Sequence, residues 1–311
     1  PTLKEPTETR EADIVIVGSG AAGCFAAYEA AKSGVGNILV VTKSGNATDS
    51  NFNEITGTAS VETAALKEAG ETFTVENMYQ RMINYAHWTV NARLLHECVK
   101  LLPSNIDIFD EMGVETMVLG DRYNFGFLNV HGFTEKNKGV NFEEGLQALG
   151  VEFLYDAPAT AILMEDGVAT GVQCESGKDV INVNAKAVLV CTGGYLANEE
   201  KVAAEYGGCK VVNMGSLNNT GDGERIVLAA GGEATLHEKR YYAIFSENTV
   251  NAMKDSPYYQ SIGAPAVWTS AATMFNAPLA NFDANLASAQ EEGWCFKASS
   301  IAELAEVTGL E

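Results

Sequence analysis

The sequence predicts an α/β fold of the Rossmann-like type, in which parallel strands alternate with helices. Three stretches favour this fold. An apolar strand enters the glycine-rich turn Gly-Ser-Gly-Ala-Ala-Gly (18–23), and a helix of small residues follows to about residue 33. A later apolar strand (185–190) ends in Thr-Gly-Gly (192–194). The turn Thr-Gly-Asp-Gly (220–223) then leads into another helix. Glycine-rich turns between a strand and a helix are typical of dinucleotide-binding folds.

Each glycine of the first turn has its own expected purpose. Gly18 permits the tight turn, Gly20 lets the backbone approach a pyrophosphate, and Gly23 lets the helix pack closely on the strand. The N-terminus of the helix offers free N–H groups and the positive end of its dipole to the phosphates. The predicted phosphate-binding residues are therefore Gly18, Ser19, Gly20, Ala21, Ala22 and Gly23.

The second strand (37–42) ends without the acidic residue that usually binds the ribose hydroxyls in this fold. Thr42 stands at that position, and Lys43 and Ser44 follow it. A threonine hydroxyl can still bind a ribose. The missing carboxylate disfavours a nicotinamide-dependent dehydrogenase of the simple Rossmann type, which we keep as an alternative.

The middle of the chain predicts helices and an inserted small β-sheet. A polar loop (45–53) precedes a long helical pattern (75–112), and a helix (143–149) precedes a strand (151–155). Three short segments with a Glu-Asp-Gly turn then predict a small antiparallel sheet. Those segments are 159–164, 169–175 and 179–183.

The turn at 220–223 has two interpretations. Asp222 or Thr220 can simply cap the following helix, which is the commoner function of such residues and the favoured one when the turn is taken alone. Alternatively, the glycines bring bare backbone close to a ligand.

The two ends of the sequence are polar or amphipathic. Residues 1–12 predict a flexible lead-in without the charged and apolar regions of a signal peptide, so a cytoplasmic location and export with the signal removed both stay open. Near the other end, 301–305 predicts a short amphipathic helix capped by Ser299 or Ser300, with Glu303 following.

Composition excludes several classes of function. The 311 residues allow two domains, or one large domain with an insertion. The net charge of -21 repels phosphate backbones and argues against nucleic-acid binding. No apolar run approaches the ~20 residues of a membrane span, so no transmembrane segment is expected. The six cysteines are scattered without a C-x-x-C pair, which disfavours a metal site and a disulfide framework.

With these motifs in place, the chain resembles the flavoprotein subunits of fumarate reductases and succinate dehydrogenases, and most of all the soluble fumarate and urocanate reductases. The resemblance rests on the turn at 18–23, the strand end at 41–43, Thr192-Gly-Gly194 with Asn198, and the turn at 220–223. It implies FAD as cofactor, an FAD-binding domain at 13–231 and a remnant of a capping domain, partial or truncated, at 232–311.

The resemblance also implies which residues meet the FAD. The ADP half is expected on the first glycine turn and near Thr42, Lys43 and Ser44. The remaining expected contacts come from four segments of the family: Ser50, Asn51, Gly57, Thr58, Ala159, Thr192, Gly193, Gly194 and Asp222.

The chemistry implied by the resemblance is hydride transfer from flavin N5 to an activated C=C bond, usually of an unsaturated carboxylate. The substrate would be a small molecule, with a possible external electron donor and no metal. This sequence lacks the family's arginine-bearing cap segment, which donates the proton, and its C-terminal flavin segment. Arg240 and His131 are the weak remaining catalytic candidates. A flavin-binding protein without reductase activity, or one part of an enzyme completed by missing segments or by another chain, is the alternative.

Overall fold

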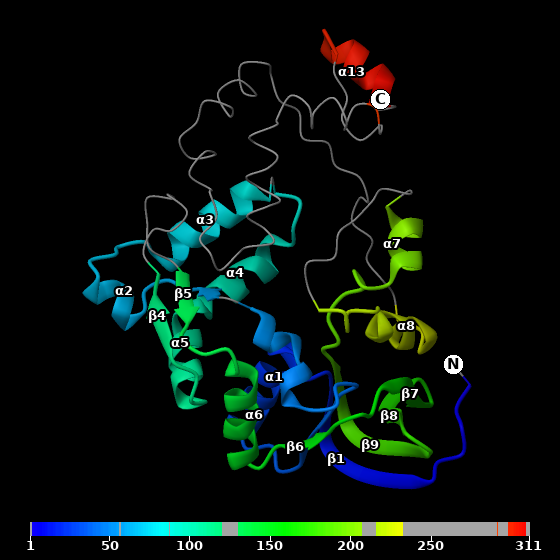
Figure 1. Cartoon of the computed structure of the whole chain (residues 1–311). Helices are drawn as coiled ribbons and strands as arrows, with labels where there is room; N and C mark the ends of the chain where they lie inside the picture. The colour runs from blue at the N-terminus through cyan, green and yellow to red at the C-terminus, as the bar shows by residue number, and fades with distance from the viewer. Residues whose placement is uncertain are drawn as a thin grey trace. The chain divides into compact units, whose positions relative to one another are not determined.

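A computed structural model describes residues 2–55, 57–86, 88–119, 130–206, 216–232, 291 and 298–308 (Figure 1). The chain divides into two units, Pro1–His237 and Glu238–Glu311. In the second unit, helix α13 (Ile301–Thr308) is described. The Ser300 hydroxyl accepts a hydrogen bond from the Glu303 N–H, and the Glu303 carboxylate accepts one from the Ser299 N–H. The expected capped helix is therefore confirmed.

The first unit is built on a six-stranded sheet with the strand order β6-β2-β1-β9-β8-β7. Strands β6, β2, β1 and β9 run parallel, and β8 and β7 continue the sheet in antiparallel pairing. The bounds are β1 (Glu8–Val17), β2 (Ile38–Val41), β6 (Glu152–Leu154), β7 (Ala159–Glu165), β8 (Val168–Ser176) and β9 (Asp179–Val190). This mixed sheet with parallel strands at its centre confirms the predicted α/β class.

Strand β1 begins earlier than the sequence indicates. Glu8 pairs with Ile181 and Val17 with Val190, so residues 8–12, expected in a flexible lead-in, belong to the sheet. The polar side chains at this end of β1 are exposed or half-buried, while the backbone pairs with β9. Strand pairing uses backbone groups, so a polar segment without an apolar face can still form part of a strand.

The three antiparallel segments are present, but they do not form a separate sheet. Strand β9 runs unbroken through both the predicted antiparallel segment and the predicted strand at 185–190. At its middle, Asn184 pairs with Glu11 on one side and Gly171 on the other. The inserted sheet is therefore continuous with the parallel strands.

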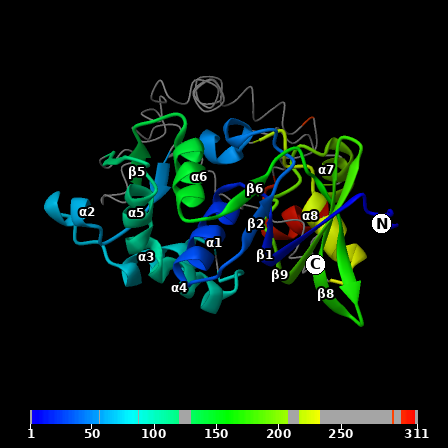
Figure 2. The same cartoon turned by 90° about the horizontal axis from the view of Figure 1, so that it is seen from below.

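Alternate residues of the central strands face two different cores, as the twofold repeat of a strand requires. Ile16, Ile38 and Val40 pack with helices α1 (Ala21–Lys32) and α6 (Lys138–Ala148). Val15, Leu39 and Val41 share the other core with Ile226 of helix α8 (Asp222–Ala229). Figure 2 shows α1 and α6 on one side of β1 and β2 and α8 on the other.

The remaining described elements are a second sheet, two short 3-10 turns and further helices. A second, antiparallel sheet has the order β3-β5-β4 and was not predicted. Its strands are β3 (Gly57–Ala59), β4 (Thr116–Val118) and β5 (Val130–Phe133). Two 3-10 turns, η1 (Ala47–Asp49) and η2 (Asn51–Glu54), precede it. The other helices are α2 (Ala64–Glu68), α3 (Val75–Tyr85), α4 (Ala92–Lys100), α5 (Leu102–Glu111) and α7 (Glu199–Glu205). Among the described helices, none has the length and apolar character needed to traverse a bilayer.

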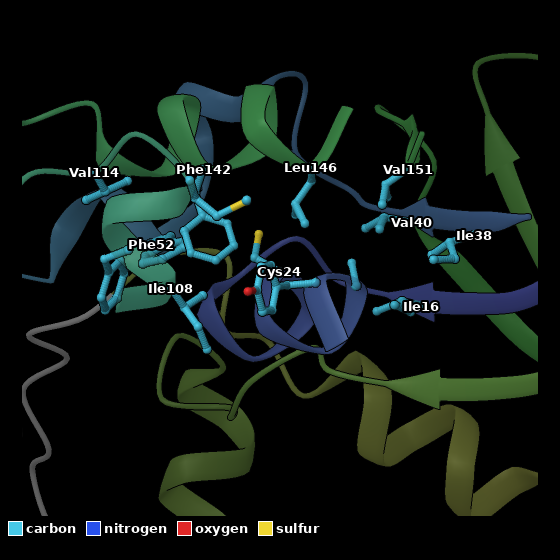
Figure 3. Close-up of a cluster of buried hydrophobic side chains, with 14 of the residues drawn as sticks. Ile16, Cys24, Ile38, Val40, Phe52, Ile108, Val114, Phe142, Leu146 and Val151 are labelled. Atoms are coloured by element: carbon cyan, nitrogen blue, oxygen red, sulfur yellow. The ribbon is translucent and has the colours of Figure 1, made fainter. Parts of the chain in front are cut away.

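An aromatic cluster joins four of these elements. Phe52 of η2 has its ring centroid 5.2 Å from that of Phe142 on α6 and 6.0 Å from that of Phe109 on α5. Phe25 of α1 lies 5.1 Å from Phe142 by the same measure. In Figure 3, Phe52 and Phe142 lie at one end of the core and Cys24 points from α1 toward α6. The cluster fixes η2 against the helices.

Candidate cofactor-binding groove

A groove with a cavity volume of about 220 Å³ lies where the parallel strands β1, β2 and β9 end. Ligands of open α/β sheets bind at such carboxyl edges. Its lining residues are Val17, Gly18, Ser19, Gly20, Ala21, Ala22, Val41, Thr42, Lys43, Ser44, Ser50, Phe52, Ile55, Pro158, Ala159, Cys191, Thr192, Gly193, Ser216, Asn218, Asn219 and Asp222.

The first glycine turn has the geometry that the sequence predicts. Gly18 adopts a φ of 106°, and a Cβ there would lie 2.5 Å from the Cys191 carbonyl oxygen. A Cβ on Gly23 would lie 1.9 Å from the Gly18 carbonyl oxygen, so α1 packs directly on the turn. Gly20 is the N-cap of α1 and no described side chain caps the helix, which leaves its first N–H groups to a ligand.

A second pair of glycines shapes the opposite side of the groove. Gly193 has a φ of 73°, and a Cβ on Gly223 would lie 2.0 Å from the Thr192 hydroxyl oxygen. Helix α8 therefore approaches the end of β9 as closely as α1 approaches the end of β1. Bare backbone on both sides provides a cradle that side chains would fill, and an extended dinucleotide such as FAD fits these residues.

The capping interpretation of Asp222 and Thr220 is wrong. The N-cap of α8 is Gly221, at a φ of 81°, and no described side chain makes a capping hydrogen bond to it. A φ in this region favours glycine, so the backbone turns there without side-chain support. Asp222 and Thr220 are instead engaged across the groove.

Lys43, at the end of β2, bridges to the turn before α8. Its Nζ lies 2.8 Å from Asp222 Oδ2 and 2.6 Å from Thr220 Oγ1, and the Thr220 hydroxyl also donates to Asp222 at 2.7 Å. Partial burial acts to raise the pKa of Asp222, but the bonds from Lys43 and Thr220 and the lysine charge outweigh it, so this pKa lies below its ordinary value. Asp222 is thus an anion paired with Lys43.

Hydroxyl groups tie the first turn to the end of β2 and to the following loop. The Ser19 hydroxyl donates to Thr42 Oγ1 at 3.2 Å, and Thr42 Oγ1 also accepts from the Ser44 N–H at 3.2 Å. The Ser50 hydroxyl donates to the Ser19 carbonyl oxygen at 2.7 Å. Thr42, at the usual acidic position, therefore has a structural purpose in the groove wall.

Most predicted site residues come together in this groove. Those that line it are Gly18, Ser19, Gly20, Ala21, Ala22, Thr42, Lys43, Ser44, Ser50, Ala159, Thr192, Gly193 and Asp222. Gly23 and Gly194 do not line it, although Gly194 accepts a hydrogen bond from the Gly221 N–H. Gly57 and Thr58 lie in β3, paired with β5, and also do not line it. The side chain of Asn51 and the whole of Arg240 lie outside what the structure describes.

Further residues, outside the individually predicted contacts, complete the groove. Val17 and Val41 are the last residues of β1 and β2, and Pro158 precedes β7. Ser216, Asn218 and Asn219 come directly before the turn at 220–223. Phe52 lies in η2, and Ile55 directly follows η2. The ends of the predicted strands could have indicated these residues, because the carboxyl ends of parallel strands all lie at the same edge of a sheet.

His131 lies in β5 and is only 1% exposed. Its Nε2 is 3.1 Å from the Thr63 hydroxyl, and its Nδ1 has no hydrogen-bond partner within the described residues. Burial lowers the pKa of this imidazole, and the Asp110 carboxylate acts weakly in the other direction. His131 does not line the groove at the strand ends, and it pairs with Thr58 in the β3-β5 ladder.

We expect Lys43→Met to lower the affinity for the cofactor roughly tenfold, about 1.4 kcal/mol. The substitution leaves the Asp222 carboxylate without its cation in a groove predicted to bind a pyrophosphate. Adding Asp222→Asn should restore part of the loss, which a double-mutant cycle on dissociation constants from flavin fluorescence would measure. Lys186→Met is the control, because Lys186 makes a comparable 2.6 Å ion pair with Asp13 on the surface. Equal losses in both variants would contradict a function for Lys43 in the groove.

The fold and the groove define a Rossmann-like dinucleotide-binding protein. A family model described as an FAD binding domain matches residues 13–124 and 131–244. The chain belongs to this FAD-binding family, and FAD is its cofactor.

Comparison with curated proteins finds two oxidoreductases. The chain is 27% identical over 232 residues to a vinyl phenol reductase of Lactiplantibacillus plantarum, covering 71% of this chain and 46% of that protein. It is 27% identical over 199 residues to an NADH:fumarate oxidoreductase of Klebsiella pneumoniae, covering 61% of this chain and 21% of that protein. The chain thus spans less than half the length of either relative.

Among solved structures, a variant of E. coli quinol fumarate reductase superposes with a TM-score of 0.58 at 19% identity. The match covers 72% of this chain and 37% of the other. At this identity the likeness concerns the fold. Together with the sequence relatives, it confirms the resemblance to the fumarate reductase and succinate dehydrogenase flavoproteins.

Proposed function

We propose that the protein to which this chain belongs is an FAD-dependent reductase of an activated C=C bond, in a small unsaturated carboxylate or a related compound. The observation that carries the proposal is the groove itself, with two glycine cradles at the ends of β1 and β9, in a chain similar to two named reductases. An external electron donor would reduce the cofactor.

When bound, FAD supplies a hydride to one carbon of the C=C bond, and a proton added to the other carbon completes the two-electron reduction. The chain's own residues bind and orient the cofactor. The free N–H groups at the start of α1 would hold the pyrophosphate, and Lys43 would supply a cation from the same groove. The described residues of the groove offer no arginine for a substrate carboxylate, so substrate binding and proton donation would come from other parts of the protein.

The test is an assay of the full-length, flavin-loaded protein with reduced viologen as electron donor. Unsaturated carboxylates, including fumarate, and a vinyl phenol serve as acceptors, because the two relatives are named for these compounds. We expect oxidation of the viologen with at least one acceptor and formation of the saturated product. No oxidation with any acceptor, in protein that carries stoichiometric FAD, would reject the reductase and favour a flavin-binding protein without this activity.

A further inference from the structure

Helix α6 begins with a lysine that folding alone does not favour. Lys138 is the first residue of the helix and is only 3% exposed. A cation in the first turn of a helix opposes the helix dipole, and burial of a cation costs free energy unless an anion compensates its charge. No carboxylate of the described residues forms an ion pair with Lys138, and burial lowers the pKa of its ammonium group. This placement requires an explanation other than stability.

In the described part of the chain the ammonium group has two partners, and neither carries a charge. Lys138 Nζ donates a hydrogen bond of 2.5 Å to the carbonyl oxygen of Asn53 in η2. It also lies 5.3 Å from the centroid of the Phe133 ring in β5, within the range of a cation–π interaction. A carbonyl dipole and an aromatic ring stabilise a cation without neutralising it. Lys138 is thus a buried positive charge held between α6, η2 and β5.

The same residue of η2 anchors the start of α6. Asn53 Oδ1 accepts a hydrogen bond of 2.8 Å from the Gly139 N–H, and the N-cap residue Asn137 makes no capping bond of its own. Asn53 Nδ2 donates to the Ala47 carbonyl oxygen at 2.9 Å and to the Thr48 carbonyl oxygen at 3.2 Å. Asn53 therefore joins α6 to both 3-10 turns.

This joint lies in the wall of the groove. Three neighbours of Asn53 in the sequence line the groove, namely Ser50, Phe52 and Ile55. The Asn53 N–H donates to the Ser50 carbonyl oxygen at 3.1 Å, which fixes the turn between them. The ammonium group of Lys138 is therefore bonded to the backbone of the segment that lines the groove.

The two ends of the groove distinguish the two halves of a bound FAD. In a dinucleotide fold the ribose of the ADP half lies at the end of β2, where Thr42 stands in this chain. Residues 158–159 line the groove at the same end, because the Ala157 N–H donates to the Thr42 carbonyl oxygen at 2.8 Å. With the ADP half at this end and the pyrophosphate at the first glycine turn, we expect the flavin half beside η2.

We propose that Lys138 is a positioning residue for the flavin half of the cofactor. It holds the groove segment 50–55 through Asn53, and its buried charge stabilises the reduced, negatively charged flavin over the oxidised, neutral one. The proposal rests on FAD as the cofactor and not on the identity of the substrate.

The direction of the effect follows from charge. Two-electron reduction with uptake of one proton leaves the flavin ring with one more negative charge near neutral pH. A fixed positive charge that water screens little lowers the free energy of this form more than that of the neutral ring. The pyrophosphate has the same charge in both forms. A cation that acts only on the pyrophosphate therefore changes the affinity for FAD without changing the reduction potential.

The experiment measures the reduction potential of the full-length, FAD-loaded protein against a reference dye during a reductive titration. Lys138→Met removes the charge and keeps an unbranched side chain. We expect it to weaken binding of reduced FAD relative to oxidised FAD about tenfold, which for a two-electron couple lowers the potential by about 30 mV. Lys138→Arg keeps the charge and should retain the wild-type potential, even where the larger group lowers the affinity for FAD. The control is Lys136→Met, which removes an exposed lysine two residues earlier and should behave as the wild type.

Lys138→Gln keeps the proposal testable if Lys138→Met fails to fold, because its amide can still donate to the Asn53 carbonyl oxygen. This variant lacks the charge and should also lower the potential. An unchanged potential in the neutral variants would overturn the proposal, even with a lower affinity for FAD. So would an equal fall in Lys138→Arg, because the fall would then reflect packing and not charge. None of these readouts needs an organic acceptor, so they separate this proposal from the proposed reductase activity.

Discussion

Replacing Gly23 by alanine should produce protein that is purified without FAD. Alanine is about 1 kcal/mol more favourable than glycine inside a helix, so propensity alone predicts a stabilised α1. The steric effect opposes this and is larger, because the new Cβ would lie 1.9 Å from the Gly18 carbonyl oxygen. That atom belongs to the backbone and cannot rotate away. Helix and turn must separate, at a cost of about 2–3 kcal/mol, and the affinity for FAD should fall roughly a hundredfold.

The measurement is the flavin absorbance of purified protein, followed by the FAD dissociation constant of the apoprotein. Gly36→Ala is the matched control, because a Cβ there would meet Asp13 Oδ2 at an ordinary 3.5 Å. The control should retain FAD. Wild-type affinity in Gly23→Ala would show that the turn tolerates a displaced α1, and the proposed phosphate cradle would then be wrong.

Replacing Phe52 by alanine should lower the free energy of unfolding by about 3–5 kcal/mol, the usual cost of truncating a buried aromatic side chain. Phe52 has no exposed surface, and its ring contacts come from α1, α5 and α6. The helices around the resulting cavity are packed against the sheet. They therefore cannot move inward to fill the cavity. Because Phe52 also lines the groove, the affinity for FAD should fall as well.

Urea denaturation followed by circular dichroism would measure this loss, with Phe52→Leu as a variant that restores much of the volume. Tyr85→Ala is the control for removal of an aromatic ring, since Tyr85 is 88% exposed and should change the stability by less than about 0.5 kcal/mol. Similar midpoints for Phe52→Ala and Tyr85→Ala would contradict the description of the aromatic cluster as a support for η2.

The sequence predicted the parts of the site that depend on local backbone geometry. Gly18 and Gly23 are required by a turn and a close approach within six residues, and such constraints are visible in a short motif. A local pattern also predicted Gly193, which has a positive φ and comes shortly after the end of β9. The pairing of Lys43 with Asp222 joins residues 179 positions apart, and no local pattern indicates it.

The sequence also did not indicate which charged side chains are buried. In the sequence, Glu143 and Glu144 are adjacent acids on a helix, and either could face solvent. The structure places Glu143 against α1 and the segment after β6, while Glu144 is exposed. Which acid is buried depends on how the helix is rotated about its axis, and this is set by Phe142 and Leu146 in the shared core.

The unbroken course of β9 limits how this domain can be cut or rearranged. A hairpin inserted into a loop can be excised or transplanted, because its removal leaves the host sheet intact. Here, excising the segment up to residue 184 would strip Glu8–Glu11 of their backbone partners. The unpaired backbone of Glu8–Glu11 would then form an unprotected edge, which invites intermolecular pairing and aggregation. Protein engineers shortening this flavoprotein domain should therefore retain β7 and β8 as part of its minimal unit.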